Sequence, residues 1–379
     1  MGWSLHHPHG LIYQAPQYCY RGYTLFSNLR GHDANLIDLD GRICHRWHWP
    51  GGINYANLLP NGNPLFYTHP PEEAGPMSGI GGHAGGLVEL DWDGNLVWQL
   101  ENPWMHHDFQ RLENGNTVAM MWEELSSDTT FRVKGGFSTA EDPGKMLGDV
   151  VREFTPSGQV VHEWKSWEHL DVQEGVICPL EGRREWTYGN CINVTSDGST
   201  LVSFRQTSTV GIVDRDSGKF TWKWGPGDLS HQHNPSFLSN GHVLLFDNGS
   251  HRRAPNTNYS KIVEVDPSNN EVVWDYRGEP AISFYSYQIS GAERQPNGNT
   301  LICEGATGRF IEVTMGNQIV WEFINPLFAD SGRLVGGSAD GRANSVFRAH
   351  RFAPDSPALR GRDLDLDRYG NLNRILGTA

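Results

Sequence analysis

Two histidines, His231 and His233, lie at the start of a segment with the pattern of a β-hairpin. The segment is HQHNPSFLSNGHVLLFDNG, and its Asn240-Gly241 pair is a strong signal for a tight turn between two strands. An imidazole can act as a nucleophile or move a proton near neutral pH. A histidine at the start of such a strand is therefore a candidate for catalysis, and similar hairpins elsewhere in the chain provide further candidates.

Polar residues occupy the same place in the other hairpins. Counting seven residues back from the turn Asn or Asp gives Asn54, His107, Asn190, His233 and Ser290. Further titratable residues near the strand starts are His106, Tyr188, His231, Arg348 and His350. The second strands end at His69, Glu123, Arg205, Asn248 and Glu304, and His83 begins a third strand. So many polar groups around one channel mouth are costly unless they are solvated or used, so we predict an active site there.

Two patterns alternate along the chain and predict the elements that position these residues. Hairpins with an Asn-Gly or Asp-Gly turn occur at residues 54–69, 107–123, 190–206, 233–248 and 290–305. The second pattern is an Asp/Gly turn followed by a strand with large side chains two residues apart. The pairs of side chains are His45/Trp47, Trp98/Leu100, His162/Trp164, Trp222/Trp224, Trp274/Tyr276 and Trp321/Phe323. Alternate residues share one face of a strand, and a repeat of roughly 50–60 residues is typical of four-stranded propeller blades. The predicted fold class is all-β, a six-bladed β-propeller.

The predicted propeller is one domain over residues 1–379, closed by its C-terminal strand. Five blades cover residues 53–103, 105–167, 186–227, 229–280 and 284–326. The remaining blade combines residues 22–49 with the strand at 344–353, because this pairing removes the open sheet edges. The charged tail, 354–379, is expected to cover the outside. The long insertions at 125–149 and 166–185 fall on the face that holds the strand starts, where function is expected.

The composition argues against several classes of function. The chain has 379 residues and a net charge of −14, which disfavours a nucleic acid or an anionic membrane surface as partner. A small aromatic or anionic substrate held by local Arg and His remains compatible with this charge. Five scattered cysteines without a CxxC motif indicate reduced buried thiols. Without a signal-peptide pattern or an apolar run of about 18 residues, the predicted location is cytoplasmic.

Several stretches resemble the bacterial arylsulfate sulfotransferases, a family of six-bladed propellers. They are HHDFQRLENGNTVAMMWE, TYGNCINVTSDGSTLVSFRQ, HQHNPSFLSNGHVLLFDNG, and ISGAERQPNGNTLICEG followed by VFRAHRFAPD. The resemblance extends over about residues 30–355. It implies that a histidine attacks the sulfur of an aryl sulfate, becomes a sulfohistidine, and passes the sulfuryl group to a phenol.

The resemblance also implies roles for individual residues. His233 aligns with the nucleophile, His107 or His106 with a supporting histidine, and Arg205 with the sulfate-binding arginine. Tyr188 departs from the family, which has a histidine there; a phenol can donate a hydrogen bond but carries no positive charge. The predicted catalytic residues are His233, His107, Tyr188 and Arg205. The predicted substrate-binding residues are His106, His231, Glu123, Asn248, His83, His69 and His350.

Other functions are compatible with the same residues. A lyase or hydrolase acting on a small anionic or aromatic substrate would use Tyr188 and the channel histidines as acid and base. The leading prediction has no cofactor, and its alternative is a divalent metal ion on His69, His83, His107 and His233, with Glu123 as a further ligand. A quinone-cofactor propeller and a non-catalytic binding propeller are weaker alternatives. For Arg205 the structural alternative is an ion pair with Glu123 or another carboxylate.

Overall fold

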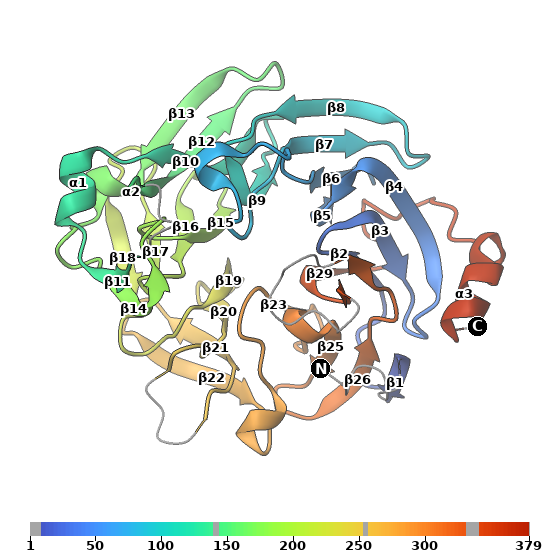
Figure 1. Cartoon of the computed structure of the whole chain (residues 1–379). Coiled ribbons are helices and arrows are strands. Elements are labelled where there is room, and N and C mark those ends of the chain that lie inside the picture. Colours follow the sequence, from blue (N-terminus) through green and yellow to red (C-terminus); the bar gives the residue numbers. More distant parts are fainter. Residues whose placement is uncertain (1–8, 139–143, 253–256, 331–340, 379) are drawn as a thin grey trace. The chain divides into compact units, whose positions relative to one another are not determined.

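The computed structural model describes residues 9–138, 144–252, 257–330 and 341–378. Antiparallel β-sheet dominates this part of the chain (Figure 1). The chain divides into two compact units: unit 1 comprises Met1–His69, Gly86–Glu101 and Ser286–Ala379, and unit 2 comprises Pro70–Gly85 and Asn102–Tyr285. Among the described residues, each unit contributes three of the six sheets that form the blades, and each also contains one two-stranded sheet. The prediction that the whole chain forms one domain stays a prediction.

In unit 2, each of the three blade sheets consists of four strands that pair in chain order. The first contains β9 (Met105–Arg111), β10 (Thr117–Glu124), β12 (Leu147–Phe154) and β13 (Val160–Lys165). The second contains β15 (Gly189–Val194), β16 (Thr200–Phe204), β17 (Thr209–Val213) and β18 (Phe220–Trp224). The third contains β19 (His233–Phe237), β20 (Val243–Asp247), β21 (Lys261–Asp266) and β22 (Glu271–Arg277).

Unit 1 contains the other three sheets. One has β5 (Tyr55–Leu58), β6 (Pro64–Tyr67), β7 (Gly86–Leu90) and β8 (Leu96–Glu101). Another has β23 (Gly291–Arg294), β24 (Thr300–Glu304), β25 (Arg309–Val313) and β26 (Ile319–Ile324). The last has β29 (Val346–Phe352), β2 (Tyr23–Asn28), β3 (Gly31–Ile37) and β4 (Ile43–Ile53), in that order. With six sheets that each contain four consecutive antiparallel strands, the predicted fold class, a six-bladed β-propeller, is confirmed.

The predicted closure by the C-terminal strand is also confirmed. β29 pairs antiparallel with β2, and His350 lies opposite Leu25 in this pairing. One strand was not predicted: β1 (Gly10–Gln14) pairs with β26 and adds a fifth strand to that sheet. Five residues with a bulge are too few to produce a readable period-two pattern.

The Asn-Gly turns form because glycine adopts positive φ without strain. Between β19 and β20, Gly241 has φ +85° and its N–H donates to the carbonyl of Leu238 at 2.9 Å. The side-chain oxygen of Asn240 accepts a hydrogen bond from the backbone N–H of His242 at 3.0 Å. The turn thereby fixes the register of the strand that His233 begins.

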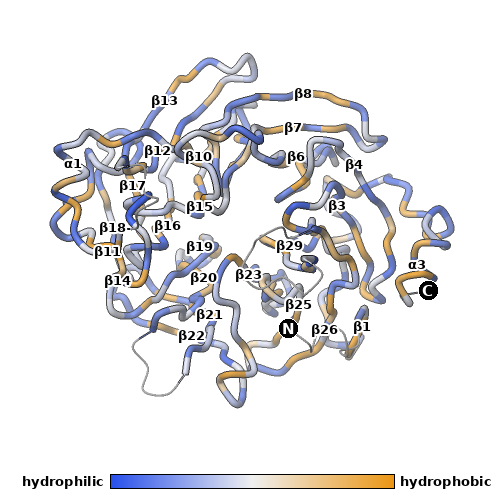
Figure 2. Tube along the Cα trace, in the orientation of Figure 1, coloured by the Kyte–Doolittle hydropathy of each residue, from blue (hydrophilic) through white to orange (hydrophobic). Residues whose placement is uncertain are grey.

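Large aromatic side chains fill the sheets, as their spacing predicts. Trp47, Trp321 and Phe323 are buried. His45 belongs to the same set of positions: it is buried, it stacks on Trp92 with ring centroids 4.1 Å apart, and its Nε2 lies 2.9 Å from the carbonyl of Trp92. Figure 2 shows hydrophobic and hydrophilic segments along β7 and β8; every residue of β7 is buried, whereas β8 is largely exposed.

Short elements lie between and after the sheets. The two long insertions of unit 2 contain α1 (Ser127–Arg132), β11 (Gly135–Phe137), α2 (Ser166–His169) and β14 (Ile177–Gly182), and β11 pairs parallel with β14. The others are η2 (Gly75–Met77), η3 (Ala281–Ser283), η4 (Gly305–Thr307), β27 (Ala329–Asp330), β28 (Arg342–Ala343), η5 (Leu366–Tyr369) and α3 (Gly370–Leu376). Among the described residues, no helix is long and apolar enough to cross a membrane.

Candidate functional site

Most of the predicted site residues lie in unit 2, near the starts of the first strands of its three sheets. β9 lies beside β15, and β15 lies beside β19 (Figure 1). The residues brought together there are His106, His107, Tyr188, Arg205, His231, His233 and Asn248. They form two series of side-chain and backbone contacts, His106 to Arg205 and His231 to Asn248, which Glu181 joins by contacting both Arg205 and His231.

The backbone is unusual at these strand starts. His107, Tyr188 and His231 have φ of +51°, +54° and +61°, in the left-handed region that non-glycine residues rarely adopt. Pairing is irregular in each of the three strands, with register shifts in β9, β15 and β19. Strained backbone of this kind is concentrated at functional sites, where the surrounding structure holds it. The bulges also explain why a simple count back from the turn does not predict which strand-start side chains meet.

His233 is held by two oxygen acceptors. Its Nδ1 lies 2.7 Å from Oδ1 of Asn248 and 3.2 Å from the backbone carbonyl of His231. A carbonyl oxygen can only accept, so Nδ1 of His233 carries the proton and donates. In the neutral ring the lone pair is then on Nε2. This is the protonation pattern that a nucleophilic histidine requires.

His106 and His107 form a second pair of imidazoles. Their Nδ1 atoms are 2.9 Å apart, so one of the two rings donates to the other. His106 is fully buried and stacks on Trp122 with ring centroids 4.2 Å apart. Burial lowers the pKa of His106 to about 3. Its Nε2 lies 3.4 Å from Oδ1 of Asp149, whose pKa burial raises to about 6.

His107 and Tyr188 pack against each other and against two glycines. The ring centroids of His107 and Tyr188 are 4.8 Å apart, in an edge-on arrangement. A Cβ at Gly82 would lie 2.1 Å from the ring of His107, and a Cβ at Gly81 would lie 2.5 Å from the hydroxyl of Tyr188. The N–H of His107 donates to the carbonyl of Gly82 at 2.8 Å. The two glycines therefore leave the space that these side chains occupy.

Tyr188 lies between His107 and Arg205. The guanidinium carbon of Arg205 is 5.4 Å from the centroid of the Tyr188 ring, a cation–π distance. Burial and, second, the nearby carboxyl of Glu185 raise the pKa of Tyr188. Burial also raises the pKa of Glu185 well above its usual value, with the charge of Asp149 as the next contribution. The phenol is therefore a hydrogen-bond donor at neutral pH.

Arg205 forms an ion pair, but not with the partner named from the sequence. Its Nη1 lies 2.8 Å from Oε1 of Glu181, on β14 of the long insertion. Glu123 instead contacts Arg152 at 3.2 Å and Lys165 at 3.1 Å, on the two outer strands of its own sheet. Glu123, named as one structural alternative for Arg205, is therefore not its partner; the ion pair is with Glu181 of the insertion.

Glu181 also connects Arg205 to two histidines. Its Oε1 lies 3.4 Å from Nδ1 of His231 and 3.5 Å from Nδ1 of His251. The His231 and His251 rings are edge-on with centroids 4.7 Å apart, and Nδ1 of His251 lies 3.5 Å from Sγ of Cys178. Burial, followed by the charge of Arg205, lowers the pKa of His231 to about 2. At neutral pH His231 is therefore an uncharged imidazole.

The predicted alternative metal set is not assembled as proposed. His83 is buried, its Nε2 lies 2.7 Å from the carbonyl of Pro103, and burial lowers its pKa. The carbonyl can only accept, so this nitrogen donates and has no lone pair for a metal. Among the described residues, the cluster with metal-ligand spacing is Cys178, His231 and His251. It does not contain His69, His83, His107 or His233.

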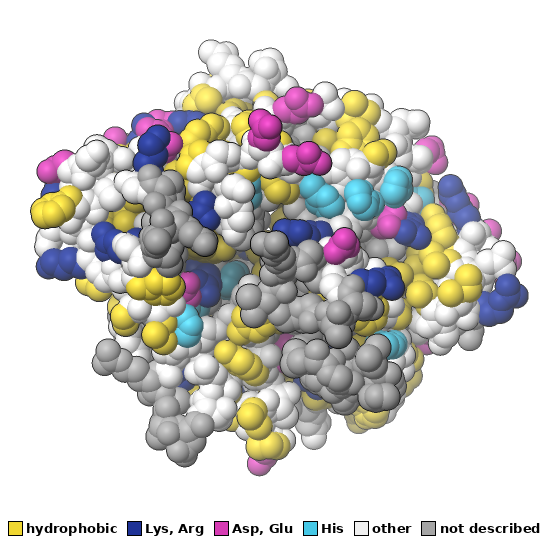
Figure 3. Space-filling model, in the orientation of Figure 1, with side chains coloured by type: hydrophobic (Ala, Val, Ile, Leu, Met, Phe, Trp, Pro, Cys, Tyr) yellow, Lys and Arg dark blue, Asp and Glu magenta, His cyan; other side chains and the backbone are white. Residues whose placement is uncertain are grey.

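The remaining predicted residues, His69 and His350, belong to unit 1. Histidine side chains gather on the surface drawn in Figure 3. The ring of His69 lies 5.1 Å from that of His32, and burial lowers the pKa of His69. In β29, His350 contacts Glu293 through Nδ1 at 3.2 Å and the hydroxyl of Tyr55 through Nε2 at 3.0 Å. Their predicted role in substrate binding stays a prediction.

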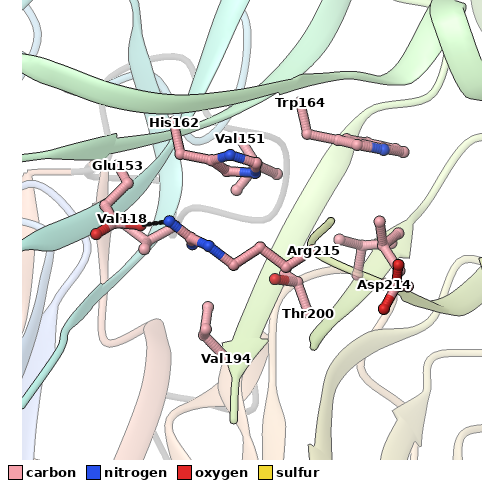
Figure 4. A pocket seen from close by; sticks show the side chains of 11 residues that line it. Val118, Val151, Glu153, His162, Trp164, Val194, Thr200, Asp214 and Arg215 are labelled. Atoms are coloured by element: carbon pink, nitrogen blue, oxygen red, sulfur yellow. Dashed lines mark ion pairs between the residues drawn. The ribbon is translucent and has the colours of Figure 1, made fainter. Parts of the chain in front are cut away.

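A pocket between two sheets of unit 2 contains a different set of residues. The ion pair of Arg215 and Glu153, 2.6 Å apart, crosses it beside His162 and Trp164 (Figure 4). Glu153 is buried, and hydrogen bonds from Asn116 and from Arg215 outweigh its burial and lower its pKa. None of the predicted catalytic residues lines this pocket, so we assign it to packing between the sheets.

The structure adds residues that the sequence analysis did not name. They are Asp149, Cys178, Glu181, Glu185 and His251. Four of these five lie within or at the end of the two long insertions predicted to carry function, and His251 follows the FDNG end of β20. The length of the two insertions was the only sequence signal for these four residues. It indicated which segments carry function but not which residues within them.

Six blade sheets, with a cluster of histidine, tyrosine and arginine at three strand starts, define a six-bladed β-propeller with a candidate active site. The arylsulfotransferase (ASST) family matches residues 58–326, which is more than half of the chain. The protein therefore belongs to the arylsulfotransferase family, and the predicted resemblance is confirmed. Membership supports arylsulfotransferase-like activity in general. No curated protein matches the chain.

Solved structures share the fold at low sequence identity. A protein of unknown function from Bacteroides caccae is 14% identical with a TM-score of 0.54, over 88% of this chain and 99% of that one. A functionally unknown protein from Desulfotomaculum acetoxidans is 9% identical with a TM-score of 0.50, over 88% and 100%. Virginiamycin B lyase from Staphylococcus aureus is 14% identical with a TM-score of 0.42, over 84% of each chain. The first two likenesses show the fold alone.

Proposed function

We propose that the protein transfers a sulfuryl group from an aryl sulfate to a phenolic acceptor, with His233 as the nucleophile. The observation that carries the proposal is the pair of acceptors at Nδ1 of His233, Asn248 at 2.7 Å and the carbonyl of His231 at 3.2 Å. They hold the proton on Nδ1, so the lone pair of the neutral ring is on Nε2. Family membership supports the reaction class.

The reaction proceeds in two displacements. Nε2 of His233 attacks sulfur, the bond from sulfur to the aryl oxygen breaks, and the phenolate leaves and takes up a proton. The oxygen of the acceptor phenol then attacks the same sulfur, the N–S bond breaks, and the acceptor loses its proton. Such a transfer depends mainly on positioning and on positive or donating groups around the sulfuryl oxygens.

Arg205 and Tyr188 supply such groups beside His107. The Arg205 guanidinium provides charge, and it is held by Glu181 at 2.8 Å. Tyr188 keeps its proton because its pKa is raised, so it donates a hydrogen bond in place of the charged histidine of other members. The substitution removes one positive charge from the site. We therefore expect slower transfer from poor donors than from aryl sulfates with acidic phenol leaving groups.

The raised pKa of Tyr188 also weighs against the alternative reaction. A lyase or hydrolase that used Tyr188 as a general base would need its phenolate near neutral pH. Burial disfavours that charge. The sulfuryl transfer uses the protonated phenol that this environment stabilises. The cytoplasmic location and the small aromatic or anionic substrate stay predictions.

The test is to incubate the protein with 4-nitrophenyl sulfate without acceptor and to measure its intact mass. We expect one added sulfuryl group, lost on addition of a phenol and absent in His233→Ala. His242→Ala is the matched control, because His242 is a histidine of the same hairpin whose Nδ1 pairs with Glu264 at 2.8 Å. An adduct that persists in His233→Ala, or repeated turnover of nitrophenyl sulfate with no transfer to an added phenol, would contradict the proposal.

A further inference from the structure

Four side chains with metal-binding atoms meet at the edge of the candidate site. Cys178 and Glu181 lie on β14 of the second insertion, His231 lies just before β19, and His251 follows β20. The ligand atoms of Cys178, His231 and His251 are all within 4.8 Å of one another. Oε1 of Glu181 is in contact with both histidines. None of these residues is the proposed nucleophile.

Three of the distances in this group are close to the edges of a metal-centred tetrahedron. Zinc bonds of about 2.0–2.1 Å to nitrogen or oxygen and about 2.3 Å to sulfur give edges of about 3.3 Å between two light atoms and about 3.6 Å to sulfur. Sγ of Cys178 lies 3.5 Å from Nδ1 of His251. Oε1 of Glu181 lies 3.4 Å from Nδ1 of His231 and 3.5 Å from Nδ1 of His251.

A separate observation concerns His231. Its side chain is 2% exposed, and its Nδ1 has no hydrogen-bond partner among the described residues. The contact with Glu181 at 3.4 Å is an approach without hydrogen-bond geometry. A buried imidazole nitrogen left without a bond is costly, and it points toward a partner that the polypeptide does not supply. A cation bound between Nδ1 and the neighbouring ligands would satisfy it.

We propose that Cys178, His231, His251 and Glu181 bind a divalent transition metal ion of the zinc type. Thiolate, two imidazoles and one carboxylate are ligands that zinc takes in four-coordinate sites. Binding converts the Cys178 thiol to a thiolate, and the proton is released to solvent. With four protein ligands the site is closed, so its role is structural.

The metal site has a consequence for Arg205. Glu181 now pairs with Arg205 at 2.8 Å, so a metal that fixes Glu181 also fixes the carboxylate that orients the guanidinium. The site further joins the insertion strand β14 to both ends of the β19–β20 hairpin. The inference is independent of the proposed transfer reaction, because it rests on ligand spacing and on the buried nitrogen of His231.

The test uses cobalt as a spectroscopic substitute for zinc. Full-length protein freed of metal with a chelator is titrated with Co²⁺ while the absorption spectrum is recorded. We expect one equivalent to bind with visible bands of tetrahedral cobalt and a near-ultraviolet band from thiolate to cobalt, and Zn²⁺ to displace it. Cys178→Ser should lose the near-ultraviolet band, whereas Cys44→Ser, at a buried cysteine of unit 1, should keep it.

His251→Gln is a second variant, at a half-exposed position. It tests the proposed metal site even if Cys178→Ser fails to fold. It should weaken binding by roughly 100-fold or more, since one of four metal bonds is lost. His48→Gln is its matched control, because His48 also lies beside a carboxylate, Asp33, at 3.0 Å. Absence of saturable binding, or cobalt affinity unchanged by His251→Gln, would overturn the proposed site.

Discussion

At the scale of single residues, a backbone carbonyl determines the chemistry of His233. Side-chain amides can be oriented either way, but the carbonyl of His231 accepts only, and it lies 3.2 Å from Nδ1 of His233. The proton is therefore placed by the main chain, whose left-handed conformation at His231 directs this carbonyl. Asn248 reinforces the same tautomer from the adjacent strand.

This arrangement makes Asn248 a positioning residue with a testable effect. Asn248→Leu removes the side-chain acceptor at 2.7 Å from His233, and we expect kcat to fall by about 10- to 100-fold, as for other groups that orient a reactive side chain. Asn248→Asp keeps an acceptor oxygen and should recover most of the rate, with a pH profile shifted upward because the carboxylate favours a charged imidazole. Equal losses in both variants, without a shifted profile, would indicate a merely structural role.

A second residue-scale prediction concerns acid stability. Burial lowers the pKa of His45 to about 4 in the folded protein, from an ordinary value of about 6.5. Between these values the unfolded chain binds the proton and the folded protein does not, so stability falls as the pH drops from 6.5 to 4. The loss is at most about 1.4 kcal/mol per pH unit. Urea unfolding of His45→Phe should show a shallower pH dependence in this window than the wild type, with no difference in slope above pH 7.

Most of the site residues that the sequence predicted lie near the start of the first strand or the end of the second strand of a hairpin with a recognisable turn. His107, Tyr188, His231 and His233 could be located in this way because Asn-Gly and Asp-Gly turns fix the register. Glu181 could not be assigned, because it lies in an insertion whose short strand shows no periodic pattern. The partner of Arg205 could not be predicted for this reason.

At the scale of elements, glycine backbone makes room for catalytic side chains. We expect Gly82→Ala to lower activity by about 100-fold, because its Cβ would lie 2.1 Å from the His107 ring and must displace it. Gly241→Ala is the matched control: Gly241 has a similar positive φ, +85° against +77°, but a Cβ there meets nothing within 4 Å. Both variants should lose about 1–2 kcal/mol of stability from backbone strain, measured by urea unfolding. Comparable activity of the two variants would contradict this role of Gly82.

Five of the six blade sheets were predictable because two signals coincided in each. A turn dipeptide marked the inner hairpin, and a pair of large side chains marked the outer strand. The sheet that contains β2 and β29 had only the second signal and was predicted from ring closure. β1 and the parallel pair of β11 with β14 lacked both signals. The bulges in β9, β15 and β19 were also unpredictable, because register shifts depend on tertiary packing.

At the scale of the whole molecule, unit 1 depends on its closing strand. Arg351 of β29 and Glu312 of β25 form a fully buried ion pair. Arg351 also donates to the hydroxyl of Thr24 on β2 at 3.0 Å and lies over the ring of Trp321, 4.4 Å from its centroid. One side chain thus links the closing strand to two sheets.

Removing this cation should therefore destabilise unit 1. We expect Arg351→Met to cost about 3–5 kcal/mol, because it leaves the carboxylate of Glu312 buried without its partner. The exposed Arg360→Met should change stability by less than about 0.5 kcal/mol. The double variant Arg351→Met/Glu312→Gln should be more stable than Arg351→Met alone. Denaturant midpoints measure all three, and a double variant no more stable than the single one would contradict the explanation.

The closing strand also affects how the protein is made. Unit 2 is nearly continuous in sequence, from Asn102 to Tyr285 apart from one short segment that precedes it, whereas unit 1 needs β29 near the other end of the chain. On a ribosome, the segment that contains His107, Tyr188, Arg205 and His233 leaves the exit tunnel well before the first sheet can receive its last strand. β2 can pair with β3 early, but its other edge must stay unpaired until β29 is made, and this exposed edge is where a chaperone would be needed.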